Sequence, residues 1–157
     1  MCDIKILDCT LRDGGYINNW CFGKKSIKNI IHCLEDAKIE IVECGFIRDV
    51  ETDEDSSVYT SMNQLAKTIY PKNPETLYAV MIEYHNRVEG KIPPYDGTSA
   101  DIIRITFRHN EWNEAKEVVK RLIKKYGITL ISIGNGTASR ESEQIVVDML
   151  KEIEEPV

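Results

Sequence analysis

Short apolar runs alternate along this chain with stretches in which apolar positions recur at helical spacing. The runs are six to nine residues long, and we predict strands at residues 4–10, 39–47, 77–84, 101–107 and 128–133. The helical stripes predict helices that carry residues 27–37, 62–69, 112–126 and 145–153. We expect Ser26 to cap the first helix and Asn110 the third, while Pro71 ends the second.

The order of these elements predicts the fold class. The strands are apolar nearly throughout, which is typical of strands buried on both faces of a parallel sheet covered by helices. A long connection without a helix separates the third and fourth strands, because residues 85–100 contain two glycines and two adjacent prolines. We therefore expect an α/β protein and a single domain over residues 1–157.

Composition and charge narrow the function classes. The 157 residues are 42% hydrophobic and 29% charged, and the formal charge of −6 comes without a basic cluster. We therefore expect no nucleic acid and no membrane as a partner. No apolar run reaches the roughly 20 residues that span a bilayer. The start of the chain lacks the basic and apolar parts of a signal peptide, so we expect a cytoplasmic protein.

Polar and charged side chains stand at the predicted carboxyl ends of the strands. Along the chain they are Arg12 with Asp13, Glu43, Glu83 with His85, Arg108 with His109, and Asn135. In parallel α/β folds the carboxyl ends of the strands gather the functional groups, so we expect these side chains to converge on one site. The alternative is a set of salt bridges around the rim of the sheet.

The first of these strand ends carries a family resemblance. The segment Asp8-Cys9-Thr10-Leu11-Arg12-Asp13-Gly14-Gly15 resembles the first-strand signature of the DRE-type metal-dependent aldolases and lyases. That group includes 4-hydroxy-2-oxovalerate aldolase, hydroxymethylglutaryl-CoA lyase and isopropylmalate synthase. The resemblance implies that the chain is part of a (β/α)8 TIM barrel, covering its first five βα units.

The resemblance also implies roles for individual residues. Asp13 would bind a divalent metal, Mn²⁺ or Mg²⁺, and Arg12 would stabilise an enolate. Glu43, on the second strand, would complete the catalytic triad. Tyr16 aligns with the position of a catalytic histidine, and a neutral tyrosine is a poor base near pH 7. We expect Arg104, His109 and Asn135 to contact the substrate.

The sequence departs from that family in its histidines and its length. The family also holds its metal through a His-x-His pair, whereas the three histidines here, His32, His85 and His109, are never separated by one residue. A complete barrel takes about 250 residues. We therefore expect metal binding by this chain to be weak or absent.

The function expected from the resemblance is a metal-dependent carbon–carbon lyase. It would cleave a 4-hydroxy-2-oxo acid to pyruvate and an aldehyde, although we expect the 157 residues by themselves to be inactive. One alternative is a Claisen-type synthase that joins an acyl-CoA to a 2-oxo acid. Another is a non-catalytic remnant that binds a small molecule or a partner at Arg12 and Asn135. Two copies could pair as a homo-oligomer to cover the exposed edges of the sheet.

Overall fold

The computed structural model describes residues 4–51, 53–84, 92–126, 128, 131 and 139–153. The chain divides into two compact units, Met1–Thr106 and Phe107–Val157, and each unit is described here by itself. The single domain expected over residues 1–157 stays a prediction.

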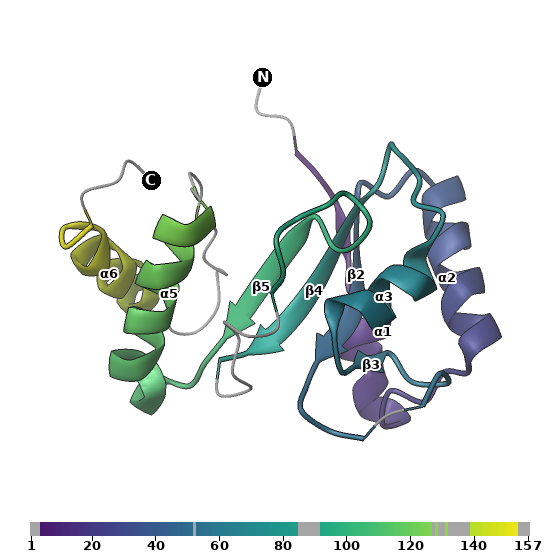
Figure 1. Ribbon diagram of the computed structural model, residues 1–157, viewed down its shortest axis with the longest axis horizontal. Coiled ribbons are helices and arrows are strands. Elements are labelled where there is room, and N and C mark those ends of the chain that lie inside the picture. The colour runs from purple at the N-terminus through teal and green to yellow at the C-terminus, as the bar shows by residue number, and fades with distance from the viewer. Residues whose placement is uncertain are drawn as a thin grey trace. The chain divides into compact units, whose positions relative to one another are not determined.

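A parallel sheet of five strands forms the centre of the first unit (Figure 1). Its strands are β1 (Leu7–Asp8), β2 (Ile41–Ile47), β3 (Val58–Tyr59), β4 (Leu77–Glu83) and β5 (Ile102–Thr106). They lie in the order β1-β2-β4-β5, with β3 paired to the end of β2, and every pairing between them is parallel. The α/β class and the parallel sheet are confirmed, whereas the partial TIM barrel is not.

Two helices of the first unit contact each other and supply part of its core (Figure 1). Helix α2 (Lys24–Asp36) buries Ile27 and Ile31, and helix α3 (Met62–Ile69) buries Met62, Leu65 and Ile69. Each set follows the i, i+4 or i, i+3, i+7 spacing that places residues on one face of a helix. The sheet contributes β2, which is buried from Val42 to Ile47. The two stripes predicted from the sequence are thus confirmed.

The predicted start of helix α2 is wrong. The helix begins at Lys24, with Gly23 rather than Ser26 in the N-cap position. The Lys24 backbone N–H donates to Asp55 Oδ1 at 2.8 Å, so a carboxylate that is distant in sequence satisfies a free donor of the first turn. Helix α3 is capped by its own neighbouring residue. Ser61, in the N-cap position, accepts a hydrogen bond at its Oγ from the Gln64 backbone N–H at 3.3 Å.

The first apolar run is a strand only at Leu7–Asp8, which is shorter than predicted. The Asp8 carboxylate accepts hydrogen bonds from the Thr10 backbone N–H at 2.9 Å and from the Thr10 hydroxyl at 3.0 Å. An aspartate that bonds to the backbone two residues onward bends the chain into a turn. Helix α1 (Thr10–Asp13) and the 3₁₀ turn η1 (Gly14–Ile17) follow. Arg12 and Asp13 therefore lie on a helical turn.

The second unit contains the 3₁₀ turn η2 (His109–Glu111) and two helices, α5 (Trp112–Tyr126) and α6 (Ser139–Leu150). Helix α5 confirms its predicted stripe, with Ala115, Leu122 and Ile123 buried. The strand predicted over 128–133 falls largely outside the described residues. In the part of the chain that the structure describes, we find no helix with the length and apolar character to cross a membrane.

Candidate functional site

The buried carboxylate of Glu43 is the centre of the main charged cluster in the first unit. Glu43 lies on β2 with no solvent exposure, and Arg12 Nε on α1 donates to its Oε2 at 2.8 Å. Arg104 on β5 donates from Nη1 to both carboxylate oxygens, at 2.8 and 2.9 Å. The structure thus brings together three of the predicted site residues, although Arg12 and Arg104 lie 31 and 61 positions from Glu43 in sequence.

Asp13 completes this ion-pair cluster of Arg12, Asp13, Glu43 and Arg104. Its Oδ1 lies 2.7 Å from Arg12 Nη1, and its side chain is 57% exposed. Burial lowers the pKa of Arg12, but the hydrogen bond and the negative charge of Glu43 outweigh burial, and the pKa is raised overall. Two cations and two anions balance one another. The salt-bridge alternative therefore accounts for these contacts without a ligand.

Asp13 is the predicted metal ligand, and in the structure its carboxylate is bonded to Arg12. Within the described parts of the chain, no group of three or more His, Cys, Asp or Glu side chains is arranged to hold a metal ion. A divalent cation usually needs about six oxygen ligands, and it would also compete with the Arg12 guanidinium for this carboxylate. The expected Mn²⁺ or Mg²⁺ stays a prediction.

Of the remaining predicted site residues, the structure describes Tyr16 within the first unit, apart from the contacts of the cluster. Tyr16 lies on η1 with 65% exposure, and its ring meets the edge of Trp20 at a centroid distance of 4.9 Å. His109 begins η2 in the second unit, whereas the cluster belongs to the first. Asn135 and His85 lie outside the described residues. The roles expected for Tyr16, His109 and Asn135 stay predictions.

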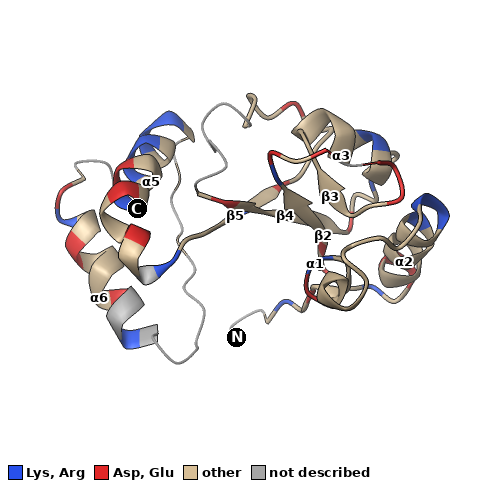
Figure 2. Ribbon diagram, turned by 90° about the horizontal axis from the view of Figure 1, so that it is seen from below, with Lys and Arg blue, Asp and Glu red and all other residues tan. Residues whose placement is uncertain are grey.

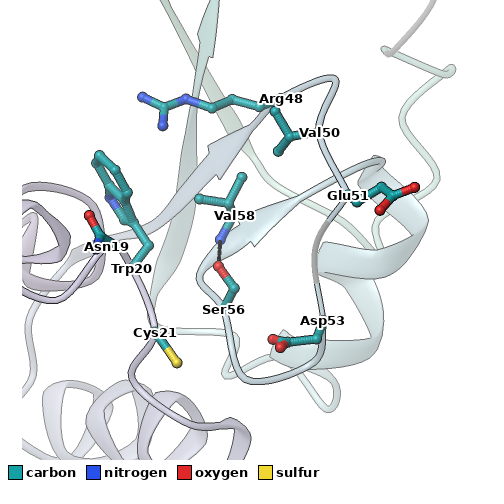
Figure 3. A pocket seen from close by; sticks show the side chains of 9 residues that line it. All are labelled: Asn19, Trp20, Cys21, Arg48, Val50, Glu51, Asp53, Ser56 and Val58. Atoms are coloured by element: carbon teal, nitrogen blue, oxygen red, sulfur yellow. Dashed lines mark hydrogen bonds between the residues drawn. The ribbon is translucent and has the colours of Figure 1, made fainter.

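A second polar site in the first unit was not predicted from the sequence. It is an open pocket of about 330 Å³ between the segment that follows η1 and the acidic loop, residues 48–57 (Figure 3). Its lining residues are Asn19, Trp20, Cys21, Arg48, Val50, Glu51, Asp53, Ser56 and Val58. The concentration of acids in the loop was visible in the sequence, but nothing local indicated that the loop folds back beside Trp20.

Three contacts hold the Arg48 side chain at this pocket. Its guanidinium carbon lies 4.6 Å from the ring centroid of Trp20 and 4.1 Å from that of Phe46, which are cation–π distances. Its Nη2 donates to Glu83 Oε1 at 3.1 Å. Glu83, which was predicted to join the site at the strand ends, is the last residue of β4 and pairs with Arg48, which directly follows β2.

Comparison with known families places a similarity in the later part of the chain. Residues 96–157 match the family model of the Tex protein YqgF-like domain. Among similar proteins is the transcriptional accessory protein Tex of Neisseria gonorrhoeae, 38% identical over 68 residues, which cover 43% of this chain and 9% of that protein. A protein of Neisseria meningitidis serogroup A is 39% identical over 70 residues, covering 45% of this chain and 9% of its own length.

A longer alignment joins this chain to the protein YdcI of Bacillus subtilis. The two are 26% identical over 140 residues, which cover 82% of this chain and 19% of YdcI. The chain therefore spans about a fifth or less of the length of the curated relatives that it matches. No solved structure matches the chain.

These findings overturn the resemblance to the DRE-type aldolases. The matching family model is that of the Tex YqgF-like domain, and the relatives include Tex itself, so the aldolase family assignment is wrong. The lyase function, its Claisen-type alternative and the expected 2-oxo acid chemistry are wrong with it. The eight-residue motif in which the resemblance began is explained in the structure by a turn and an ion pair.

The exclusion of nucleic acid as a partner is also contradicted, because Tex is a transcriptional accessory protein. The physical reason is that the net charge was averaged over the whole chain. Residues 1–106 contain 12 Lys or Arg and 17 Asp or Glu, whereas residues 107–157 contain 8 and 9. The excess of acid is therefore concentrated in the first unit, and the second is close to neutral.

Proposed function

We propose that this chain takes part in transcription-related nucleic-acid binding, with the contacts made by the region of residues 96–157. The observation that carries the proposal is the match of that region to the Tex protein YqgF-like domain. The name of the N. gonorrhoeae relative, transcriptional accessory protein Tex, supports the same direction. A cytoplasmic location, expected from the sequence, is consistent with this role and is part of the proposal.

The basic end of helix α5 is the surface that we expect to contact phosphates. Arg121, Lys124 and Lys125 are all exposed and lie within the last two turns of the helix. Figure 2 shows this end of α5 in blue. Lys120 and Lys116, one and two turns before Lys124, are bonded to Glu152. Arg121, Lys124 and Lys125 place three exposed positive charges at one end of α5, where they can neutralise a nucleic-acid backbone.

Binding of a fluorescein-labelled single-stranded oligonucleotide, followed by anisotropy over a range of salt concentrations, tests the proposal. We expect a Kd of about 10⁻⁴ to 10⁻⁶ M, in the range of sequence-independent binding. Each phosphate contact with a single strand contributes about 0.7 to the slope of log K against log salt. The double variant Lys124→Gln with Lys125→Gln should therefore bind more weakly, with a slope reduced by about 1.4.

A matched control removes two lysines from the first unit. Lys25 and Lys28 lie on α2, and the variant Lys25→Gln with Lys28→Gln makes the same change in net charge. We expect this control to keep the parent slope. Absence of binding by the parent chain at low salt would contradict the proposed function. Equal loss in both double variants would show that net charge, rather than the end of α5, governs binding.

A further inference from the structure

One carboxylate of the second unit holds two lysines of helix α5. Lys116 and Lys120 both donate to Glu152, which follows the end of helix α6 in the chain. The bonds join residues that lie 36 and 32 positions apart in sequence. Helices α5 and α6 lie next to each other in both views (Figure 1, Figure 2). The contact therefore depends on the tertiary structure of this unit.

The backbone around Glu152 fixes the position of its side chain. The Glu152 N–H donates to the Met149 carbonyl at 3.0 Å, and the Ile153 N–H donates to the Leu150 carbonyl at 3.2 Å. Met149 is only 1% exposed, so the end of α6 that precedes this turn is anchored in the interior. The Glu152 side chain itself is 47% exposed. Its carboxylate is thus held at the surface in a defined place.

The two lysines are more restricted than those at the end of α5. The side chains of Lys116 and Lys120 are 22% and 20% exposed, and Lys120 also lies 3.3 Å from Glu117 on the same helix. The hydrogen bond from Lys120 to Glu152 is the main cause that raises the pKa of Lys120. The bonds from both lysines lower the pKa of Glu152. Lys120 and Glu152 therefore stay charged at neutral pH.

The lysines that Glu152 holds continue the basic end of α5. Lys116, Lys120 and Lys124 recur every four residues, so they follow one stripe of the helix. At a rise of about 1.5 Å per residue, this stripe is about 12 Å long. A carboxylate and a phosphate both accept hydrogen bonds from a lysine ammonium group as anions. Glu152 therefore occupies donors that a phosphate could use.

We propose that Glu152 is an internal competitor of nucleic acid, and that Lys116 and Lys120 are further phosphate contacts which it restrains. An exposed ion pair is weak by itself, but a competitor within the same chain acts at a high effective concentration. The exposed end of α5 then binds alone, and removal of the Glu152 charge extends the surface along the helix. This inference rests on the proposed function, because it concerns the same surface.

The variant Glu152→Gln tests the inference in the salt-dependent anisotropy experiment. It should bind the single-stranded oligonucleotide about 5-fold more tightly at low salt. Two added phosphate contacts should make the slope of log K against log salt steeper by about 1.4. The matched control Glu143→Gln removes an exposed carboxylate of α6 and should keep the parent slope. Addition of Lys116→Gln and Lys120→Gln to Glu152→Gln should restore the parent slope.

A second measurement detects the restraint without nucleic acid. Acetylation by N-hydroxysuccinimidyl acetate, followed at each lysine by mass spectrometry, reports the fraction of neutral amine. Because the bond to Glu152 raises the pKa of Lys120, this lysine should react about 3-fold faster in Glu152→Gln than in the parent. The exposed Lys25 on α2 provides an internal reference whose rate should not change.

The outcomes separate this inference from the proposed function. If the parent binds, and Glu152→Gln matches Glu143→Gln in affinity and slope, the inference is overturned and the proposed function stands. An unchanged acetylation rate at Lys120 would also overturn the inference, whether or not nucleic acid binds. Binding by Glu152→Gln but not by the parent would support the restraint and contradict binding through the exposed end of α5 alone. If neither chain binds at low salt, both proposals fail.

Discussion

Replacement of Glu43 by glutamine should destabilise the first unit strongly. The substitution keeps the size of the side chain and removes its charge, so the guanidinium groups of Arg12 and Arg104 lose their shared counter-ion. Two atoms, Arg12 Nε and Arg104 Nη1, now donate to the Glu43 carboxylate in three contacts at 2.8 to 2.9 Å. In the variant an amide group with its own N–H donors would face at least one of them.

The expected magnitude follows from the burial of the three side chains. Removal of one partner from a buried ion pair typically costs 3–5 kcal/mol. Glu43 has no exposure and Arg12 is 15% exposed, but Arg104 is 39% exposed and can turn partly to water. We therefore expect the lower end, about 3 kcal/mol. The more exposed partner should matter less, so Arg104→Gln should cost about 1–2 kcal/mol.

Urea unfolding followed by Trp20 fluorescence measures this loss in the Trp112→Phe background. Trp112 lies on α5 in the second unit, so its removal leaves a signal from the first unit only. A Glu43→Gln variant within about 0.5 kcal/mol of its parent would refute the reasoning, because that is the usual effect of a neutral surface change. A larger loss of stability for Arg104→Gln than for Glu43→Gln would refute the expectation that the more exposed partner contributes less.

Two further predictions concern the backbone and the pH dependence of the first unit. At Gly45, where φ is +136°, a Cβ would clash with the Ser57 carbonyl oxygen, so Gly45→Ala should cost more than about 3 kcal/mol. Gly97→Ala, where φ is +82° and the space is open, should cost about 1–2 kcal/mol, and similar losses in thermal unfolding would contradict the argument. Burial raises the pKa of Asp101, but hydrogen bonds from Lys72 and two other donors outweigh it and the pKa is lowered overall. The stability it confers is present above the unfolded pKa and is lost as the pH falls through the folded pKa, so Asp101→Asn should flatten the fall in Tm between about pH 5 and pH 2. If Asp101→Asn left the profile of Tm against pH unchanged, the result would count against a stabilising ion pair between Asp101 and Lys72.

The strands that could be predicted from the sequence are those with long apolar runs. Strands β2, β4 and β5 each lie within one or two residues of their predicted bounds. A strand that is buried on both faces of a parallel sheet requires such a run, so the apolar run itself indicates a buried strand. Strand β3 was not predicted, because its two residues, Val58 and Tyr59, are too few to show a period.

Features that depend on distant contacts could not be predicted. The start of α2 is set by Asp55, which lies 31 positions from Lys24, so Ser26 gave a misleading local signal. The predicted first strand ends early and helix α1 begins at Thr10, because Asp8 turns the chain there. Propensity and periodicity describe neighbours in sequence, whereas these elements depend on particular side-chain hydrogen bonds.

The candidate site also has a part that could be predicted from the sequence and a part that could not. The meeting of Arg12 and Glu43 was predicted from the strand ends, whereas Arg104, which lies within β5, was expected only as a substrate contact. Their chemistry was not predictable, because ion pairs and catalytic groups use the same residue types. The match to the Tex YqgF-like domain lies over residues 96–157, and the composition of the whole chain concealed it by averaging an acidic part with a nearly neutral one.

The ion-pair cluster also has a consequence for synthesis on the ribosome. Glu43 and Arg12 are both made early, but Arg104 is translated 61 residues after Glu43. A nascent chain that has not yet reached β5 carries the Glu43 carboxylate with one arginine available, and strand β4 still has an unpaired edge. Completion of the sheet and neutralisation of its central charge therefore coincide in time, near the last residues of the first unit.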